Sequence, residues 1–409
     1  MTTKFKPVDE QLAYLKKGVA EIVPEPELRA KLEKSLRTGV PMRVYLGVDP
    51  TAPDIHLGHT VVLRKLKHFQ DLGHTAIFLI GDFSAMIGDP TGRSETRPPL
   101  SREEVDAHAK TYLEQVFKLL DPVKTEVRRN SEWLDKLSSQ EIVRICGHYS
   151  LARMLEREDF RSRLENQQPI SVHELLYPLL TAYDAVMLKT DVELGATEQK
   201  FNLLVHRSIQ REYGLEGEVA LTMPILVGLD GQRKMSKSLG NYVGITEPPQ
   251  EIFGKIMSIP DELMWTYYEL VTDRTPEEIA SLKNDVASGT KHPMDVKMRL
   301  AEEIIGTFHD AEAARKAAEN FQRVFRDRQA PAEAEEQKIP CGPPKKLVAL
   351  LAELKLVGSK NEAIRLIEQG GVEIDGVRVE VARKEIDLSQ PNEFLLRAGK
   401  KKFLRIVVE

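Results

Sequence analysis

The stretch RVYLGVDPTAPDIHLGHTVVLRKLKHFQDLGHTAIFLI, residues 43–80, decides the fold. Its first six residues, 43–48, are rich in strand formers and predict a β-strand. Between 57 and 72 the apolar residues recur at helical spacing, and Gly73 gives that helix a C-terminal stop. Residues 75–80 are continuously apolar, as in a strand buried on both faces of a parallel sheet. This strand–helix–strand unit predicts an α/β protein with a doubly wound, Rossmann-like parallel sheet, which binds ligands at the carboxyl ends of its strands.

The rest of the chain divides by periodicity and composition. Residues 100–211 read mostly as helix, and the run 220–229 reads as a further strand. We expect five segments, namely a Rossmann-like domain with a helical insertion (1–229), a mobile loop (230–247), a helical domain (248–328), a Pro- and Glu-rich linker (329–343) and a small α+β module (344–409).

The composition is that of an ordinary globular protein, with 41% hydrophobic and 30% charged residues. No apolar run approaches the roughly 18 to 20 residues that span a bilayer, and the N-terminus lacks a signal-peptide core. The two cysteines, Cys146 and Cys341, lie far apart in the sequence. This argues against a disulfide framework or a cysteine metal site and fits a reducing cytoplasm.

Two histidines follow the first strand in the run Pro53-Asp54-Ile55-His56-Leu57-Gly58-His59. They stand three apart at a helix start, so they point the same way and can donate hydrogen bonds to phosphate oxygens beside the positive end of the helix. Gly58 has no β-carbon, so a flat base can lie close to the backbone. A metal pair is an alternative, although no carboxylate or third histidine stands at ligand spacing. If this motif stood alone, the preferred interpretation would be a helix start with two incidental histidines.

A second motif, Lys234-Met235-Ser236-Lys237-Ser238, follows the second strand-like run and Gly231. Its flexible backbone lets two ammonium groups close over a triphosphate and exclude water. Arg93 and Arg97, in the loop after residue 80, are candidates for pyrophosphate contacts. The alternative, for the lysine–serine motif and for these two arginines, is that they are ordinary solvated surface charges.

The two motifs, in this order and with a strand before each, resemble the ATP-handling signatures of class I aminoacyl-tRNA synthetases. The runs YLGVDPTA (45–52) and YPLLTAYD (177–184) are similar to bacterial tyrosyl-tRNA synthetases, and the similarity extends from about residue 40 to the C-terminus. The resemblance implies catalytic roles for Thr51, His56, His59, Lys234 and Lys237. It implies tyrosine binding by Tyr45, Asp89, Tyr177, Thr181, Asp184 and Gln199. It implies ATP binding by Gly47, Gly58, Arg93, Arg97, Gly195, Glu198, Lys234, Ser236, Lys237 and Ser238.

The residues themselves suit a tyrosine pocket. Tyr177, Thr181 and Asp184 stand at i, i+4 and i+7, on one face of a helix. A buried carboxylate that accepts the phenolic proton is left unpaired by phenylalanine, and this family is the standard worked example of the resulting discrimination of about 10⁴ to 10⁵. Without the resemblance, Asp184 reads as a helix-surface carboxylate and Tyr177 as a core aromatic.

The sequence departs from the family pattern at three positions. Thr181 replaces the usual glutamine and cannot offer a long amide to the α-ammonium group of the substrate. The turn Gly195-Ala196-Thr197-Glu198-Gln199 replaces Gly-Gly-[Ser/Thr]-Asp-Gln. Ala196 adds a methyl group near the nucleotide, and Glu198 lengthens a ribose-binding carboxylate by one methylene.

The C-terminal module is slightly basic. Residues 344–409 hold 13 Lys/Arg against 10 Asp/Glu, so, in a chain of net charge −5, the other residues carry −8. A capping box at Ser359 to Glu362, a helix that ends at Gly370-Gly371 and a strand and tight turn over 372–377 resemble an RNA-binding module. That module is shared by a ribosomal small-subunit protein, pseudouridine synthases and bacterial tyrosyl-tRNA synthetases. Candidate phosphate contacts are Lys345, Lys346, Lys360, Arg365, Lys400, Lys401 and Lys402. Singly, each reads as plain surface.

The resemblance implies a cytoplasmic tyrosine–tRNA ligase, active as a homodimer, without membrane or DNA partners. Tyrosine and ATP give tyrosyl-adenylate and pyrophosphate, and the tyrosyl group then passes to the 3′-terminal adenosine of tRNA(Tyr). Mg²⁺ is expected to enter on the ATP phosphates; no metal site and no tightly bound cofactor are expected. The helical domain is expected near the anticodon. Two alternatives remain: a tryptophan–tRNA ligase, expected to lack Tyr45, Asp184 and the module, and a non-catalytic RNA-binding paralogue.

Overall fold

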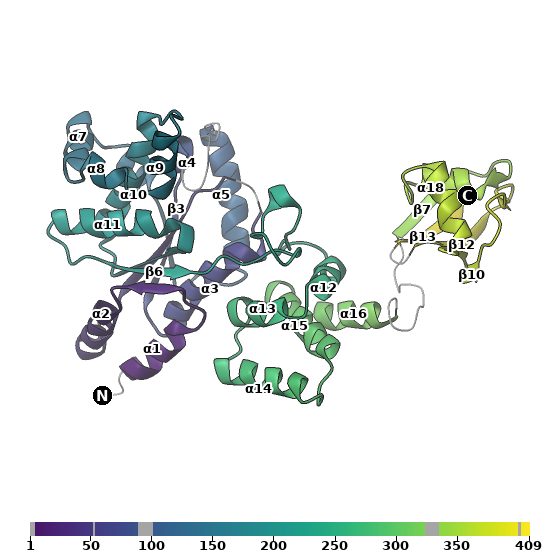
Figure 1. Ribbon diagram of the computed structural model, residues 1–409, viewed down its shortest axis with the longest axis horizontal. Coiled ribbons are helices and arrows are strands. Elements are labelled where there is room, and N and C mark those ends of the chain that lie inside the picture. Colours follow the sequence, from purple (N-terminus) through teal and green to yellow (C-terminus); the bar gives the residue numbers. More distant parts are fainter. Residues whose placement is uncertain (1–4, 52–53, 89–100, 324–334, 400–401) are drawn as a thin grey trace. The chain divides into compact units, whose positions relative to one another are not determined.

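The computed structural model describes residues 5–51, 54–88, 101–323, 335–399 and 402–409 (Figure 1). The chain divides into two compact units, Met1–Ala311 and Glu312–Glu409, which are described separately. Among the described residues, no helix combines the length and the apolar character needed to cross a membrane.

The first unit is built around a sheet with the strand order β1-β6-β5-β2-β3-β4. The strands are β1 (Glu21–Val23), β2 (Arg43–Val48), β3 (Thr75–Ile80), β4 (Thr125–Arg129), β5 (Val192–Ala196) and β6 (Val219–Met223). Neighbouring strands are parallel, except that β1 is antiparallel to β6. The chain order reverses between β2 and β5, which is where doubly wound sheets bind their ligands. The predicted sheet is therefore confirmed. The predicted strand 220–229 is shorter, since it ends before Pro224, which cannot donate to a ladder.

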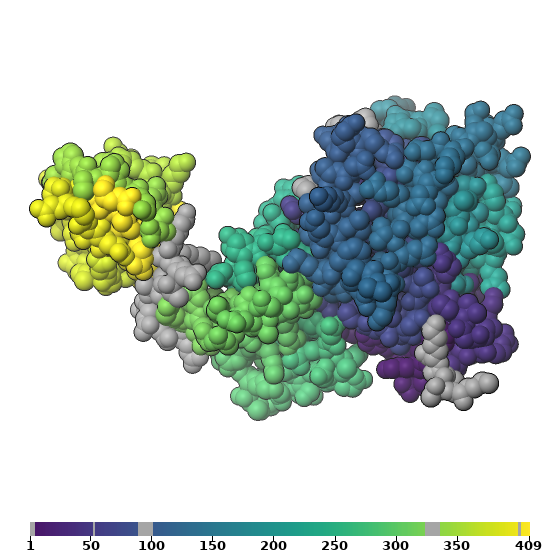
Figure 2. All heavy atoms as spheres, turned by 180° about the vertical axis from the view of Figure 1, so that it is seen from behind, coloured from purple at the N-terminus to yellow at the C-terminus, as the bar shows by residue number. Residues whose placement is uncertain are grey.

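Helices cover both faces of this sheet (Figure 1). On one face lie α1 (Val8–Lys16), α2 (Glu25–Thr38) and α3 (Leu57–Asp71), and on the other lie α10 (Val172–Leu188) and α11 (Lys200–Glu212). Within residues 100–211, predicted to be mostly helical, the insertion contains α5 (Arg102–Val116), α6 (Ser131–Leu134), α7 (Ser139–Gly147), α8 (Leu151–Met154) and α9 (Glu158–Glu165). The same range also holds β4 and β5, which the sequence did not predict, and the short helix α4 (Ser84–Ile87) precedes it. Seen from behind, much of this insertion forms a broad blue face of the unit (Figure 2).

The predicted helical domain begins with α12 (Pro249–Ser258), α13 (Leu263–Val271), α14 (Pro276–Ala287) and α15 (Pro293–Phe308). Three of these helices begin at a proline, whose fixed φ suits the first helical position. Two polar links join α13 to the sheet domain. Lys17 donates to the Thr272 carbonyl oxygen at 2.7 Å, and buried Arg64 of α3 pairs with Asp273.

The second unit contains α16 (Ala311–Phe321), which begins one residue before it, and a small α+β fold. Its main sheet has the order β10-β9-β12-β13-β7, from β7 (Glu335–Ile339), β9 (Val372–Ile374), β10 (Val377–Arg378), β12 (Asn392–Ala398) and β13 (Lys402–Val408). Beside it lie β8 (Lys345–Lys346), α17 (Leu347–Glu353), α18 (Lys360–Glu368) and β11 (Glu385–Ile386). Its own apolar core includes Leu347, Leu351, Ala363 and Leu396.

Two local expectations for this unit need correction. Residues 335–339 were expected in a linker, but they form β7, which pairs in parallel with β13. The predicted capping box is only half formed. The Ser359 hydroxyl accepts from the Glu362 amide at 3.2 Å, whereas the Glu362 carboxylate accepts from the Gly358 amide at 2.7 Å. The tight turn is confirmed, since Asp375 and Gly376 have φ of 50° and 80°, as a type I′ hairpin requires.

Candidate functional site

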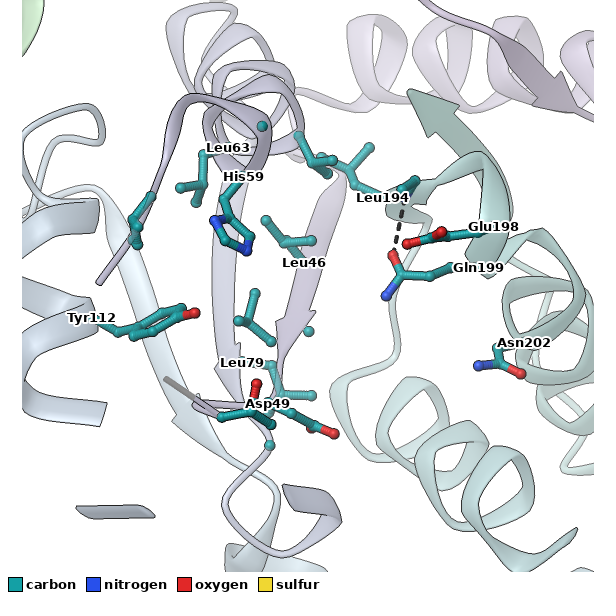
Figure 3. A pocket seen from close by; sticks show the side chains of 18 of the residues that line it. Leu46, Asp49, His59, Leu63, Leu79, Tyr112, Leu194, Glu198, Gln199 and Asn202 are labelled. Carbon is teal, nitrogen blue, oxygen red and sulfur yellow. Dashed lines mark hydrogen bonds between the residues drawn. The ribbon is translucent and has the colours of Figure 1, made fainter. Parts of the chain in front are cut away.

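A cavity of about 740 Å³ opens at the carboxyl ends of β2 and β5. Figure 3 shows His59 of α3 on one wall and Glu198 and Gln199, beyond β5, on the other. Most of the predicted site residues line this one cavity: Tyr45, Gly47, Thr51, His56, Gly58, His59, Tyr177, Thr181, Asp184, Glu198, Gln199, Lys234, Ser236, Lys237 and Ser238. Among the described residues, Gly195 is predicted but does not line the cavity. Asp89, Arg93, Arg97, Lys400 and Lys401 lie outside the described residues.

The two histidines cap their own helix reciprocally. The Nδ1 atom of His56 accepts from the Gly58 amide at 3.1 Å, and Nδ1 of His59 accepts from the His56 amide at 3.2 Å. Burial, together with neighbouring positive groups, lowers the pKa of His56 to about 3 and that of His59 to about 4. Both rings are therefore neutral, with the hydrogen on Nε2, and each can donate from Nε2.

Gly58 is needed for a reason that the sequence did not reveal. A β-carbon added there would lie 2.9 Å from Cε1 of His56. The glycine therefore makes room for the capping histidine ring, whether or not a nucleotide is present.

The lysine–serine loop is tethered across the mouth of the cavity. The ammonium group of Lys234 lies 3.2 Å from a carboxylate oxygen of Glu198, and that of Lys237 donates to the Asp54 carbonyl oxygen at 2.7 Å. The Met235 side chain is buried and anchors the loop. The backbone amide of Ser236 donates to Asn241 Oδ1 at 2.9 Å.

The cavity floor holds a fixed carboxylate. Asp184, on α10, is 3% exposed and accepts from Trp133 Nε1 at 2.7 Å and from Asn130 Nδ2 at 3.2 Å. Burial raises its pKa well above the usual carboxyl range. Tyr45, at 1% exposed, lines the same cavity. The surface-carboxylate alternative for Asp184 is therefore wrong.

A second set of polar side chains lies around Tyr177. Its hydroxyl donates to Asp49 Oδ2 at 2.9 Å, and the Ser84 hydroxyl donates to Asp49 Oδ1 at 2.6 Å. The Thr181 hydroxyl donates to the Tyr177 carbonyl oxygen at 2.8 Å and lies 3.0 Å from His206 Nε2. The Thr181 hydroxyl is thus engaged by protein groups, which the sequence did not predict.

The turn after β5 is closed by its own glutamine. The Oε1 atom of Gln199 accepts from the Ala196 amide at 3.0 Å (Figure 3). A β-carbon on Gly195 would lie 3.0 Å from that oxygen, so the glycine makes room for the closing amide.

Four polar residues at the site were not predicted from the sequence: Asp49, Glu193, His206 and Glu218. Asp49 could have been found, because it directly follows β2 at the carboxyl edge of the sheet. The other three bring one ligand atom each within 4.8 Å of one another. Their only sequence signals are a glutamate inside buried β5 and another directly before buried β6.

Imidazoles at a helix start, a lysine loop facing them and a polar pocket at the switch point of a parallel sheet together define a class I aminoacyl-tRNA synthetase. The family described as tRNA synthetases class I (W and Y) matches residues 37–326, and the S4 domain matches residues 345–389. The chain is 53% identical over 401 residues to a tyrosine–tRNA ligase of Oleidesulfovibrio alaskensis, covering 98% of this chain and 99% of the relative. Over 403 residues it is 54% identical to that of Moorella thermoacetica, covering 98% and 96%. The chain belongs to the tyrosine–tRNA ligase family.

Solved structures agree with this fold. Tyrosyl-tRNA synthetase of Archaeoglobus fulgidus complexed with L-tyrosine aligns with a TM-score of 0.60 and 26% identity, covering 76% of this chain and all of that one. A truncated mitochondrial tyrosyl-tRNA synthetase of Aspergillus nidulans aligns with a TM-score of 0.65, 21% identity and coverage of 78% and 94%, a likeness of fold. The predicted class, fold and ligase activity are confirmed.

Proposed function

We propose that this cavity joins tyrosine to ATP and then charges tRNA(Tyr), with the residue roles given below. One observation carries these assignments. The Tyr45 and Asp184 side chains lie in the same cavity as the two histidines and the two loop lysines, although they come from four separate segments of the chain.

Asp184 is proposed to accept the phenolic hydrogen of the substrate. Burial leaves its carboxylate poorly solvated and raises its pKa, and a phenolic donor relieves this. Trp133 and Asn130 fix its position beforehand. Phenylalanine would bury the same carboxylate without that donor, which is the physical basis of its rejection.

Asp49 and Tyr177 are proposed to face the α-ammonium group, with Asp89, Thr181 and Gln199 beside them. Asp49 supplies a carboxylate held by two hydroxyl groups. A fixed anion of this kind compensates for the missing amide at position 181.

His56 and His59 are proposed to donate from Nε2 to ATP phosphate oxygens, at the positive end of α3. Lys234 and Lys237 leave Glu198 and Asp54 and close on the phosphates. Thr51, Gly47, Gly58, Gly195, Arg93, Arg97, Ser236 and Ser238 complete the proposed ATP site. Mg²⁺ is proposed to be held mainly by the phosphates.

The reaction needs positioning and charge stabilisation rather than a protein nucleophile. An oxygen of the ionised tyrosine carboxylate attacks the α-phosphorus in line, a P–O bond forms, and the bond to pyrophosphate breaks with its electron pair leaving on pyrophosphate. The adenosine hydroxyl of tRNA then attacks the activated carbonyl carbon and loses its proton, the bond between that carbon and the phosphate oxygen breaks, and AMP leaves with the electron pair.

The S4 domain supports tRNA contacts by Lys345, Lys346, Lys360, Arg365, Lys400, Lys401 and Lys402. We further propose a cytoplasmic homodimer without membrane or DNA partners and a helical domain near the anticodon. Exposed apolar side chains on the insertion, Val143, Leu151 and Leu164, support a protein contact there.

Amino-acid-dependent ATP–pyrophosphate exchange, across all twenty amino acids with Mg²⁺, tests this proposal. Exchange with tyrosine alone is expected. Exchange with tryptophan would overturn the substrate assignment. No exchange from folded protein would favour the non-catalytic paralogue and implicate Thr181, Ala196 and Glu198.

A further inference from the structure

Three buried ionisable side chains lie behind Tyr45, outside the roles assigned above. Glu193 of β5, His206 of α11 and Glu218, directly before β6, are 4%, 5% and 0% exposed. Both carboxylate oxygens of Glu193 lie 2.9 Å from His206 Nδ1. Thr190 donates its hydroxyl to Glu218 on the far side of the cluster.

The hydrogen bonds of Thr181 determine which atoms of His206 carry hydrogen. A threonine hydroxyl has one hydrogen, and the Tyr177 carbonyl oxygen, 2.8 Å away, can only accept it. The Thr181 oxygen must therefore accept from His206 Nε2, 3.0 Å away. Nε2 of His206 thus carries a hydrogen, and Nδ1 faces the Glu193 carboxylate.

The Tyr45 hydroxyl lies beside this pair. Its oxygen is 3.4 Å from His206 Nδ1, and the Glu193 carboxylate is a further acceptor close enough to raise the pKa of Tyr45, in addition to burial. The hydroxyl has one hydrogen. If it points to Glu193, it cannot donate to the phenolic oxygen of a substrate, whose own hydrogen goes to Asp184.

We propose that His206, as an imidazolium, is a positioning residue of the tyrosine site, which donates from Nδ1 to Glu193 and from Nε2 to Thr181 and so leaves the Tyr45 hydroxyl to the substrate phenol. This inference rests on the proposed role of Tyr45 in tyrosine binding. It links Thr181, a residue that departs from the family pattern, to Tyr45 through one imidazole ring.

The test compares two substitutions of similar size in the full-length protein. His206→Leu fills the space without a donor, whereas His206→Gln keeps an N–H group for Glu193. In ATP–pyrophosphate exchange, His206→Leu is expected to raise KM for tyrosine about tenfold, with KM for ATP and kcat within about twofold of the parent. His206→Gln is expected to stay within about threefold in KM for tyrosine.

A double substitution separates hydrogen-bond competition from a packing defect. In His206→Leu/Glu193→Gln a neutral amide oxygen, a weaker acceptor, replaces the carboxylate, so the Tyr45 hydroxyl is drawn toward position 193 less strongly, and KM for tyrosine is expected to return to within about threefold of the parent. His68→Leu, a buried histidine of α3 outside the cavity lining, is the matched control and is expected to leave KM for tyrosine unchanged.

Three results would overturn the inference. These are an unchanged KM for tyrosine in His206→Leu, a raised KM that Glu193→Gln does not restore, and one equivalent of bound metal in the purified protein, since His206 would then be a ligand. Parent protein is assayed in parallel, and absence of its tyrosine-dependent exchange would overturn the proposed function itself.

Discussion

Asp184 is held by two side-chain donors, Trp133 Nε1 and Asn130 Nδ2, before any substrate is present. The carboxylate therefore has a structural and a recognition role at once. Removing it leaves Trp133 Nε1 without this acceptor, a cost of about 1–3 kcal/mol, whereas Asn130 Nδ2 keeps its bond to the Ser84 hydroxyl.

We predict that Asp184→Ala lowers the kcat/KM of tyrosine-dependent exchange by at least about 100-fold, since a hydrogen bond to a buried charge is lost. The free energy of unfolding is expected to fall as well, which the sequence alone did not suggest. Urea denaturation beside the exchange assay measures both effects. Unchanged exchange in this variant would move phenol recognition to another residue.

At the scale of single residues, most of the residues predicted from the sequence line the cavity, but the buried groups that contact them were not predicted. Tyr45, Thr181 and Asp184 stand in runs that resemble known ones. His206 is 25 positions from Thr181 and 161 from Tyr45, and only the fold brings them within 3.0 and 3.4 Å. No periodicity in one sequence encodes such contacts.

Among the elements, the lysine loop is held by an exposed ion pair between Lys234 and Glu198, so we expect this pair to contribute little to stability. The side chains of Lys234 and Glu198 are 55% and 42% exposed. Exposed pairs of this kind contribute little to folding.

We predict that Lys234→Ala lowers kcat for exchange about 10²- to 10³-fold, because one charge that stabilises the transition state is lost. The midpoint of thermal unfolding is expected to stay nearly unchanged. Arg233→Ala is the matched control, since Arg233 pairs with Asp230 and does not line the cavity. Equal losses in both variants would contradict a specific role for Lys234.

Helix α3 carries a pH-dependent element of stability in His68. This ring is 3% exposed, and burial, aided by nearby positive groups that include Lys65, Lys17, Arg64 and Lys67, lowers its pKa to about 2. Its two ring nitrogens have no hydrogen-bond partner among the described residues. His68 is therefore neutral in the folded protein.

The sign of the effect follows from the lowered pKa. In the unfolded chain His68 has a pKa of about 6.5, so below this pH it binds a proton there, whereas in the folded protein it stays neutral. The free energy of unfolding therefore falls as the pH falls. We predict that His68 removes about 2 kcal/mol between pH 6.5 and 5, and that His68→Leu shows a correspondingly smaller loss. Urea denaturation of both proteins at pH 7 and pH 5 measures it. Parallel losses in the two would contradict the assignment.

For the elements, the sequence predicted the strand–helix–strand unit and the helical regions because hydrophobic periodicity is a local property. It missed β7, whose sequence EEQKI has no strand pattern of its own. That strand forms because β13 offers it an open row of backbone partners, which is a tertiary cause.

At the scale of the whole molecule, the chain consists of two units with separate apolar cores. We predict that a fragment ending at Arg323 catalyses tyrosine-dependent exchange within about twofold of the full chain, since its cavity is complete without the second unit. Its aminoacylation of tRNA is expected to fall at least about 100-fold, because phosphate contacts supply much of RNA affinity. Full charging by the fragment would show that the second unit is dispensable for tRNA recognition.

The pairing of β7 with β13 has a consequence for aggregation. β13 alternates buried and partly exposed side chains and would otherwise present its backbone along an open sheet border, a template on which other chains can assemble. β7 covers that border with a short segment bearing Glu336 and Lys338, charges that discourage further strand addition. An isolated module that begins at residue 344 is therefore expected to self-associate in light scattering, whereas one that begins at residue 335 is expected to stay monomeric. We therefore expect residues 335–343, which include β7, to protect the edge of β13 against the addition of strands from other chains.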